Sequence, residues 1–509
     1  MLNKIFDLDK SEEVLTPLRK EGKKIVHCHG VFDLIHPGHI KHLEAAKKFG
    51  DVLVVTITED KLVNKGPGRP VFNEILRAET LAALQVVDFV AISRNQLATV
   101  AIEAIKPDFY VKGQEYKVDE DDITGGIVPE RNKVEEFGGK LVFTEEIVFS
   151  STNIINRHLD FADETVKDYL KRIRELTNFD KIYKDFERIA NYKVVVIGDI
   201  ILDEYTTVIP LGKASKSSTI TAKRLDSELY AGGVLAVANH ISNFVKEVKL
   251  ITTIGNNYGK DYTNFIQSKL NKNIKLSKVY TDDRPTVLKQ RYVDRAFKGK
   301  LFEIIDIEDI PLPDETRNQI IAELHGIENE YDLVVVADFG HGMIDNEIVN
   351  YLCAKDIFLA VNTQTNSANT GFNLLTKYPR CNYFSIDENE AQLATHDKYS
   401  DIDVIFNKLL HRSSAAIAAI TLGIRGAMVG SLHNKRGVKA PVLSSEVIDT
   451  IGAGDAFLSI TSLMAKNQNT PDEIAFVGNA VGAMAVKILG NKSYIEKIPL
   501  MKYVRTLLT

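Results

Sequence analysis

The amino-acid sequence predicts an α/β protein with two domains, each built on a mainly parallel sheet covered by helices. The chain has 509 residues, too many for a single hydrophobic core. Short apolar, strand-like runs alternate with helical patterns in both halves, as in parallel α/β sheets. A charged helical stretch at residues 160–190 separates the two halves. Ligands of such sheets bind at the carboxyl ends of the strands, where we expect the functional residues.

Composition narrows the possible partners and location. Apolar residues make up 44% of the chain and charged residues 26%, as in ordinary globular proteins. The net charge of −6 and the pI of about 6.1 give no basic footprint, so neither nucleic acid nor a membrane is expected as a partner. No apolar run approaches the roughly 18 residues of a membrane span. The N-terminus lacks the apolar core of a signal peptide, and three dispersed cysteines suit a reducing compartment, so we expect a cytoplasmic protein.

In the first half, five strand-like runs alternate with helical patterns. The first run leads into a glycine-bearing turn, Gly30 to His39, and then into an amphipathic helix pattern. The five runs are residues 24–28, 51–57, 89–92, 109–111 and 140–143.

His36 and His39 lie three positions apart at the start of that helix, so both imidazoles can face one site. A metal site would need a third ligand that the neighbouring sequence does not supply. Isolated histidines are usually structural. The adjoining glycine-bearing strand-to-helix turn favours contact with phosphate instead, where N–H donors would stabilise charge during nucleotidyl transfer.

Four segments over residues 24–157 resemble the cytidylyltransferase-like nucleotidyltransferases. They are Gly-x-Phe-Asp-x-x-His-x-Gly-His from Gly30, Lys65-Gly66-x-Gly68-Arg69-Pro70 with Arg77, Val111-Lys112-Gly113, and the Ser150-Ser151-Thr152 cluster. Taken singly, each basic residue could be a solvated surface charge and the Ser/Thr cluster a plain helix N-cap. The resemblance implies catalytic roles for His36, His39 and Lys65. It also implies nucleotide or phosphate contacts for Gly30, Phe32, Asp33, Arg69, Arg77, Lys112, Ser151 and Thr152.

The second half is again α/β. Strand-like runs occur at 193–197, 248–251, 333–337, 358–361 and 415–421. Alternating polar and apolar residues at 218–224 and 286–294 suggest extra strands that form a lid. The polar run from Asn362 to Asn366 follows a strand and is a candidate lining for the phosphate or sugar side. We expect most of it to be an exposed loop.

Near the C-terminus, Asp449 to Phe457 join a strand-like run at 445–448 to an apolar helix pattern. Gly452 and Gly454 let the backbone turn, and the N–H groups at the helix start form a candidate anion site. Asp455 would lie at the same place, where a carboxylate can take a proton from an attacking hydroxyl. An ordinary helix N-terminus with glycine in the turn is the simpler alternative.

Residues 192–500 resemble the ribokinase-like (PfkB) sugar kinases. The matching segments are Gly-Asp-x-x-Leu-Asp from Gly198, the pair Gly232-Gly233, and Asp449 to Asp455. The resemblance implies Asp455 as the base and the N–H groups of Ile451 to Gly454 as the anion hole. It implies nucleotide or phosphate contacts at Thr450, Gly452, Ala453 and Gly454. It further implies nucleotide contacts at Gly423 and Arg425, sugar contacts at Asp199, Asp203, Gly232 and Gly233, and Mg²⁺ held through water by Glu390.

Two departures from the kinase pattern stand out. Ala236 replaces an asparagine that contacts a sugar hydroxyl in the family, which weakens any copied sugar preference. Asp387 replaces the asparagine of Asn-x-x-Glu, which bears on Mg²⁺ handling.

Together, the two resemblances imply a domain order and a fold class. We expect a Rossmann-like nucleotidyltransferase domain at 1–160, a helical linker at 161–190, and a ribokinase-like α/β domain with a small β lid at 191–509. The same pair of activities occurs in the bifunctional heptose kinase/adenylyltransferases, where the kinase comes first. The swapped order argues for a relative with its own substrate.

The implied reaction sequence is phosphorylation of a sugar or sugar phosphate by ATP with Mg²⁺, followed by nucleotidyl transfer from ATP or CTP to the sugar 1-phosphate. A polyol- or glycerol-phosphate cytidylyltransferase fused to an independent kinase is an alternative, and a nucleotide-sugar sensor with one degenerate domain is another. The expected partners are small-molecule sugars and nucleotides. A homodimer is common in both families, and the oligomeric state is left open.

Overall fold

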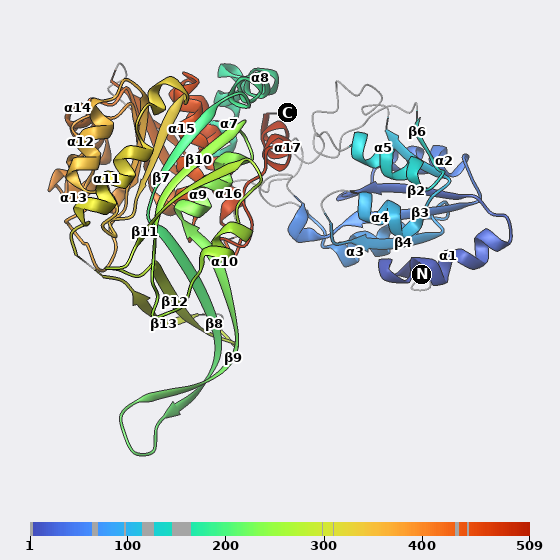
Figure 1. Ribbon diagram of the computed structural model, residues 1–509. Coiled ribbons are helices and arrows are strands. Elements are labelled where there is room, and N and C mark those ends of the chain that lie inside the picture. The colour runs from blue at the N-terminus through green and yellow to red at the C-terminus, as the bar shows by residue number, and fades with distance from the viewer. Residues whose placement is uncertain are drawn as a thin grey trace. The chain divides into compact units, whose positions relative to one another are not determined.

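The computed structural model describes residues 4–63, 70–95, 98–113, 127–144, 164–297, 299–308, 310–432, 437–444 and 447–508. The chain divides into two compact units, one of residues 1–167 with 498–509 and the other of residues 168–497 (Figure 1). Both are α/β, which confirms the predicted fold class. No helix among the described residues is long and apolar enough to cross a membrane.

The first unit contains a six-stranded sheet in the order β1-β4-β3-β2-β5-β6, with every pairing parallel. From β2 the chain adds β3 and β4 on one side of this strand, and then β5 and β6 on the other side. The strand order therefore reverses at β2, and ligands of such sheets bind at the carboxyl end of the strand where the order reverses. The strands are β1 (Ile5–Phe6), β2 (Ile25–Gly30), β3 (Val52–Thr58), β4 (Phe89–Ser93), β5 (Phe109–Gly113) and β6 (Lys140–Thr144). They confirm the five runs predicted from the sequence.

Helices pack on both faces of this sheet, and β3 is buried along its whole length because both faces are covered. The helices are α1 (Ser11–Lys20), α2 (Pro37–Lys47), α3 (Glu74–Ala82), α4 (Thr99–Ile105) and α5 (Ile127–Glu136), with short 3-10 turns η2 (Leu8–Lys10) and η3 (Asp60–Leu62). In Figure 1 the strands and helices of residues 4–144 are drawn in blue to cyan, and α17 near the C-terminus is drawn in red.

The second unit contains a nine-stranded sheet in the order β11-β10-β7-β14-β15-β16-β17-β18-β19, parallel from β11 to β17 and antiparallel beyond. Residues of eight of its strands form one large apolar core with the helices on one face. The strands are β7 (Lys193–Gly198), β10 (Glu247–Gly255), β11 (Ile274–Thr281), β14 (Leu333–Asp338), β15 (Phe358–Thr363), β16 (Tyr383–Asp387), β17 (Ile417–Thr421), β18 (Ala427–Ser431) and β19 (Val438–Ala440).

A separate four-stranded sheet, β13-β12-β8-β9, forms the lid expected from the sequence. In Figure 1 the β8–β9 hairpin extends well away from the main sheet of its unit. The strands are β8 (Ile200–Lys213), β9 (Ile220–Gly233), β12 (Val287–Asp294) and β13 (Lys300–Asp306). Asp199 is the single residue between β7 and β8, so the lid begins directly at the carboxyl end of the main sheet.

Most helices of the second unit cover its main sheet, and α15 and α16 are buried along nearly all their length. They are α7 (Glu164–Leu176), α8 (Phe179–Ile189), α9 (Val234–Ser242), α10 (Thr263–Ser268), α11 (Asp314–Glu323), α12 (Asn346–Ala354), α13 (Glu388–Thr395), α14 (Ile402–Ser413), α15 (Ala453–Lys466) and α16 (Pro471–Ala485). The described residues also form α17 (Lys497–Leu508) and the short turns η6 (Ile327–Asn329), η7 (Leu375–Lys377) and η8 (Gly423–Arg425).

The stretch expected to be a linker forms α7 and α8. On α8, Asp185 accepts a hydrogen bond from Asn469 at 2.7 Å, and the ring of Phe186 lies 5.5 Å from that of Phe244. This helix is therefore packed into the second unit. The exact domain bounds predicted from the sequence stay predictions.

One predicted strand is wrong in its described part. Val447 and Ile448, expected to end a strand before the glycine loop, are exposed and belong to no strand. The backbone N–H of Ile448 donates to the carbonyl of Val486, so this segment is fixed by the end of α16 rather than by a sheet.

Candidate active sites

In the first unit, the turn after β2 brings His36 and His39 together. His36 is the N-cap of α2, and its Nδ1 accepts a hydrogen bond from the N–H of Gly38 at 3.1 Å. A neutral imidazole that accepts at Nδ1 carries its proton on Nε2, which is then a donor for a ligand oxygen. Burial lowers the pKa of His36, which favours this neutral form. The two rings stack at 3.9 Å, so the predicted histidine pair is present as one unit.

Phe32 and Asp33 shape the same turn. Phe32 has a φ of 47°, unusual for a bulky residue, and its ring lies 5.3 Å from that of His39. A Cβ on Gly30 would meet the Phe32 ring at 3.1 Å, so glycine keeps this approach open. The Asp33 carboxylate accepts from the N–H of Val71 at 2.6 Å and thereby ties the turn to the segment before α3.

Arg77, predicted to contact phosphate, instead lies inside the protein at 1% exposure. Its guanidinium donates to the carbonyls of Phe72, Val31 and Thr58 and to the Asp60 carboxylate. Four protein acceptors leave this group little capacity for a nucleotide. In the structure Arg77 therefore organises the loops around the site, and its predicted phosphate contact stays a prediction.

Lys112 lies at the end of β5 in a buried polar group. Its ammonium pairs with Glu130 at 2.9 Å, and Tyr110 donates to the same carboxylate at 3.1 Å. Burial acts to raise the pKa of Glu130, but Lys112 outweighs it and the net shift is downward. The predicted phosphate contact of Lys112 stays a prediction, because in this structure its ammonium is paired with the Glu130 carboxylate. Of the other predicted residues, Lys65, Arg69, Ser151 and Thr152 lie outside the described residues.

In the second unit, Asp449 shapes the loop before α15. Its carboxylate accepts from the N–H of Ile451 at 3.2 Å, from the N–H of Gly490 at 3.1 Å and from the Tyr205 hydroxyl at 3.3 Å. Lys300 of the lid pairs with it at 3.2 Å. These contacts fix the loop so that Gly452, with a φ of 80°, starts the helix.

Asp455 lies in the first turn of α15 and is 7% exposed. Its Oδ1 accepts a hydrogen bond from Nε2 of Gln364 at 2.9 Å. Burial, with a further contribution from the nearby carboxylate of Asp203, raises the pKa of Asp455 to about 7. A carboxylate with such a pKa suits proton abstraction near neutral pH.

Two cavities meet at this loop. One of about 320 Å³ is polar and is lined by residues of the lid, the strand ends and the loop, among them Asp203, Lys289, Arg291, Asp387, Glu390, Gly452, Asp455 and Asn491. The other, of about 730 Å³, is mainly apolar and includes Leu422, Val442, Phe457, Ala483 and Val486. Asp387, Thr421, Thr450 and Gly454 line both. A phosphate bound at the loop would thus be accessible from each cavity.

The predicted sugar residues fall into two groups. The Asp203 carboxylate lines the polar cavity, paired with Arg291 and hydrogen-bonded by Asn491 at 3.3 Å. A Cβ on Gly232 would overlap this carboxylate, and Gly233 also lines the cavity. Asp199 instead accepts from the backbone N–H groups of His341 and Met343, so it holds the loop after β14.

Glu390, predicted to hold Mg²⁺ through water, closes a capping box at the start of α13 with Asp387. Burial, together with the neighbouring Asp387, raises the pKa of Glu390 to about 8. Both residues line the polar cavity. Because Mg²⁺ in phosphate sites keeps several waters and uses one or two carboxylates, this pair fits an ion carried by a nucleotide.

The predicted nucleotide loop forms the turn η8. Gly423 has a φ of 59° and lines the apolar cavity. Arg425 pairs with Glu388 at the start of α13, and its predicted nucleotide contact stays a prediction.

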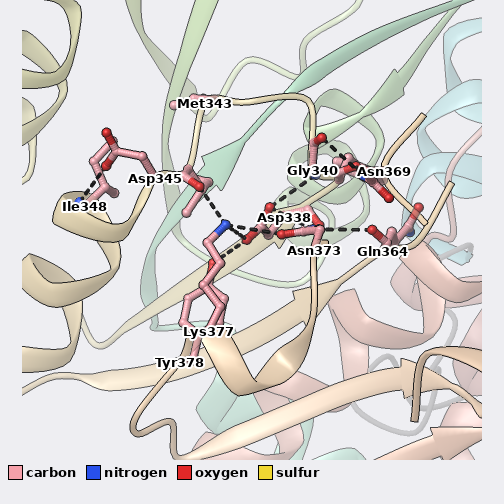
Figure 2. Close-up of polar contacts among 12 residues, drawn as sticks. Asp338, Gly340, Met343, Asp345, Ile348, Gln364, Asn369, Asn373, Lys377 and Tyr378 are labelled. Carbon is pink, nitrogen blue, oxygen red and sulfur yellow. Dashed lines mark hydrogen bonds and ion pairs between the residues drawn. The ribbon is translucent and has the colours of Figure 1, made fainter. Parts of the chain in front are cut away.

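The loop after β14 is fixed by a buried ion pair (Figure 2). Asp338 is 1% exposed, and its carboxylate accepts from Lys377 and from the Tyr378 hydroxyl, each at 2.7 Å. Asn373 reaches the same carboxylate at 3.1 Å. This cluster cross-links the loops that follow β14 and β15.

Sequence reasoning missed several cavity residues. Lys289, Arg291 and Asn491 were not singled out, and the run at 362–366 was expected to be mostly exposed. Asn362 and Thr363 are in fact buried, and Gln364 contacts Asp455. A polar run directly after a buried strand was the available signal, since strand ends line ligand sites in parallel sheets.

Comparison with known proteins finds a family match within each half. Residues 27–157 match the model of the Cytidylyltransferase-like family, and residues 354–497 match the pfkB family of carbohydrate kinases. The chain therefore carries a cytidylyltransferase-like domain followed by a carbohydrate kinase domain, which confirms the recognition of both.

Curated relatives match the N-terminal part of the chain. The Bifunctional protein HldE of Desulfatibacillum aliphaticivorans is 42% identical over 156 residues, 30% of this chain and 30% of the relative. The Bifunctional protein HldE of Campylobacter jejuni (strain RM1221) is 47% identical over 112 residues, 22% of this chain and 24% of the relative. The order of the two domains is swapped relative to HldE. The match thus spans less than a third of these relatives.

Among solved structures, phosphofructokinase-2 from Escherichia coli superposes with a TM-score of 0.49 at 14% identity, covering 62% of this chain and 99% of that one. The Arabidopsis thaliana ribokinase complexed with ribose and ATP gives a TM-score of 0.48 at 16% identity, covering 62% and 99%.

Proposed function

We propose that this protein is a bifunctional enzyme that makes a nucleotide-sugar in two steps. The kinase domain phosphorylates the anomeric hydroxyl of a sugar or sugar phosphate with ATP, with a heptose-like sugar as the leading candidate. The transferase domain then couples the sugar 1-phosphate to a nucleotidyl group from ATP or CTP and releases pyrophosphate. The nucleotide-sugar would supply synthesis of cell-surface polysaccharide.

The observation that carries the kinase half is Asp455 beside the glycine loop. Asp455 would take the proton of the acceptor hydroxyl, and the N–H groups at the start of α15 would stabilise the transferred phosphoryl group. The acceptor would occupy the polar cavity, and the nucleotide base the apolar one. Mg²⁺ would neutralise charge on the nucleotide phosphates, with Glu390 and Asp387 contacting its waters.

The cavity supports an acceptor with several polar groups. Asp203 and Asn491 can accept from or donate to hydroxyls. The Lys289 ammonium has no hydrogen bond or ion pair among the described residues, so it is available to a hydroxyl or to a phosphate that the sugar already carries.

In the transferase half, His36 and His39 would bind the phosphates of the nucleotide. The Nε2–H of His36 would donate to a phosphate oxygen and stabilise the charge that builds up as the sugar phosphate attacks. The relatives' shared description as bifunctional supports coupling of the two steps.

The test is to incubate the full-length protein with Mg²⁺, ATP, CTP and a panel of heptoses, pentoses, hexoses and their phosphates. ADP and pyrophosphate are measured, and the product is identified by mass spectrometry. Asp455→Ala should abolish ADP formation, and with it pyrophosphate release from unphosphorylated sugars, but should keep pyrophosphate release from a supplied sugar 1-phosphate. His39→Ala should abolish pyrophosphate release alone. Formation of neither ADP nor pyrophosphate by the wild type would contradict the proposal.

The alternative is a polyol- or glycerol-phosphate cytidylyltransferase fused to an independent sugar kinase. Two candidate sites, one in each unit, are compatible with it. The same assay separates the cases, because in the alternative the transferase leaves the kinase product unconsumed and accepts a polyol phosphate.

A further inference from the structure

Gln364 follows β15 directly, and its backbone is fixed on both sides. Its N–H donates to the carbonyl oxygen of Asp338 at 2.8 Å, and its own carbonyl accepts from Nδ2 of Asn373 at 3.3 Å. Figure 2 shows Gln364 attached in this way to the cluster around Asp338. The position of Gln364 therefore depends on the loops after β14 and β15 together.

The cluster that anchors Gln364 is rigid for a physical reason. Asp338 and Lys377 form a buried ion pair, and the remaining capacity of the Asp338 carboxylate is taken by Tyr378, Asn373 and the N–H of Gly340. Moving either loop would leave a buried charge without its partner, which costs several kcal/mol. The backbone at Gln364 thus has one strongly preferred position.

From this anchored backbone, two neighbouring groups contact two of the acidic residues that line the polar cavity. The Gln364 side chain donates to Oδ1 of Asp455 at 2.9 Å, while the N–H of Thr365 donates to Oε1 of Glu390 at 2.9 Å. The dipeptide therefore fixes where the candidate base and the carboxylate on the nucleotide side lie relative to each other.

We propose that Gln364 is a positioning residue for phosphoryl transfer: it occupies Oδ1 of Asp455, so that Oδ2 takes the proton of the acceptor hydroxyl. This rests on the proposed kinase function. In the step, the O–H bond of the acceptor breaks and an Oδ2–H bond forms. The acceptor oxygen bonds to the γ-phosphorus of ATP while the bond from that phosphorus to the bridging oxygen breaks, and ADP leaves.

Donation from Gln364 also supports the charged form of the base. Asp203 on β8 and Glu390 on α13 bring negative charge near Asp455, whereas Lys289 on β12 opposes it. Among these groups, Gln364 is the neutral donor in direct contact with the carboxylate. Without it, the base would hold its proton to a higher pH.

The experiment compares wild type with Gln364→Met, which keeps the side-chain volume and removes the donor, and with Gln364→Glu, which places a second carboxyl group beside Asp455. Gln290→Met is the matched control, because Gln290 donates to the Glu204 carboxylate at 2.6 Å in the same unit but does not line the polar cavity. For each protein, kcat and KM for ATP are measured from pH 5 to 9.

We expect the acid limb of kcat/KM to move to higher pH by about 0.5–1 unit in Gln364→Met, since donation from the Gln364 amide stabilises the charged carboxylate over the neutral acid by about 1 kcal/mol. The shift should be larger in Gln364→Glu, because two adjacent carboxyl groups share a proton. The KM for ATP should change less than about two-fold, and Gln290→Met should keep the wild-type limb. An acid limb of Gln364→Met that coincides with that of wild type would overturn the proposal.

A second measurement does not need turnover. The melting temperatures of wild type and Gln364→Met are compared from pH 5 to 9, alone and in an Asp455→Asn background, as a double-mutant cycle. Gln364→Met should destabilise more at pH 8 than at pH 5, and Asp455→Asn should remove this difference. If wild type forms no ADP, the kinase proposal fails, and this cycle alone decides whether Gln364 supports the charged Asp455.

Discussion

Asn491 Oδ1 lies 2.6 Å from the position that a Cβ on Gly452 would occupy. Gly452 also has a φ of 80°, which side-chain-bearing residues rarely adopt. The loop before α15 thus tolerates only glycine here for two independent reasons.

Gly452→Ala should therefore lose kinase activity and destabilise the protein by about 1–3 kcal/mol. Gly454→Ala is the matched control, because a Cβ there meets no atom within 4 Å and the position is helical. It should unfold at the wild-type temperature or slightly above, yet raise the KM for ATP because Gly454 lines both cavities. ADP assays and thermal melts check both variants. A Gly452→Ala protein that melts and turns over like wild type would refute the assignment.

The raised pKa of Asp455 predicts how stability changes with pH. The folded-state value of about 7 exceeds the ordinary 3.8, so between these values the folded protein holds a proton that the unfolded chain has lost. The free energy of unfolding must then fall as the pH rises from about 4 to 7. Burial raises the pKa of Glu390 as well, to about 8, which acts in the same direction.

Asp455→Asn removes this penalty. Unfolding measured by denaturant titration should show equal stability of variant and wild type near pH 4 and a gain in the variant at pH 8 of up to roughly 4 kcal/mol, from a three-unit shift. ADP formation should be lost at every pH. A variant that is less stable than wild type at pH 8 would mean that Asp455 is charged and well supported in the folded protein.

Local spacing allowed part of each site to be predicted. His36 and His39 share a helix start, and Asp449 to Asp455 span one loop and the first turn of α15, so their proximity follows from helix geometry and glycine positions alone. Gln364 could not be placed in this way, because its contact with Asp455 joins residues 91 positions apart and depends on the order of β14 and β15 in the sheet.

Arg77 illustrates a second limit of prediction from the sequence, because the motif is present but does not reveal what the side chain contacts. Its spacing from the glycine-rich segment matches the nucleotidyltransferase pattern, yet its side chain is buried among backbone carbonyls. The sequence does not distinguish an arginine whose guanidinium contacts a ligand from one whose guanidinium supports the surrounding loops. Both roles place an arginine at the same position of the motif. The edge strand β13 was missed for another reason: five of its seven residues are exposed, so it lacks the apolar pattern of a sheet.

His36 combines two roles that substitution can separate. It caps α2 through Nδ1 and would donate to phosphate through Nε2. Asparagine is a good N-cap but cannot place a donor where Nε2 lies, so His36→Asn should keep the melting temperature while pyrophosphate release falls at least ten-fold. His36→Ala should lose the activity and also about 1 kcal/mol of stability. Full activity of His36→Asn would limit this residue to capping.

Arg77→Lys tests whether the buried guanidinium is a loop organiser. Lysine keeps the charge but has three donors at one point, so it cannot reach the carbonyls of Val31, Thr58 and Phe72 together with the Asp60 carboxylate. Unsatisfied buried acceptors should destabilise the first unit by about 2–4 kcal/mol. In thermal melts, an unfolding transition of the variant should move to lower temperature.

The kinase assay supplies the control for this variant, because Asp455 and its cavity belong to the second unit. ADP formation by Arg77→Lys should match wild type at temperatures below the shifted transition. Pyrophosphate release should fall mainly through kcat, since His36 and His39 depend on the turn that Arg77 supports at Val31. A variant with wild-type melting and a raised KM for the nucleotide alone would instead return Arg77 to the role of a direct phosphate ligand.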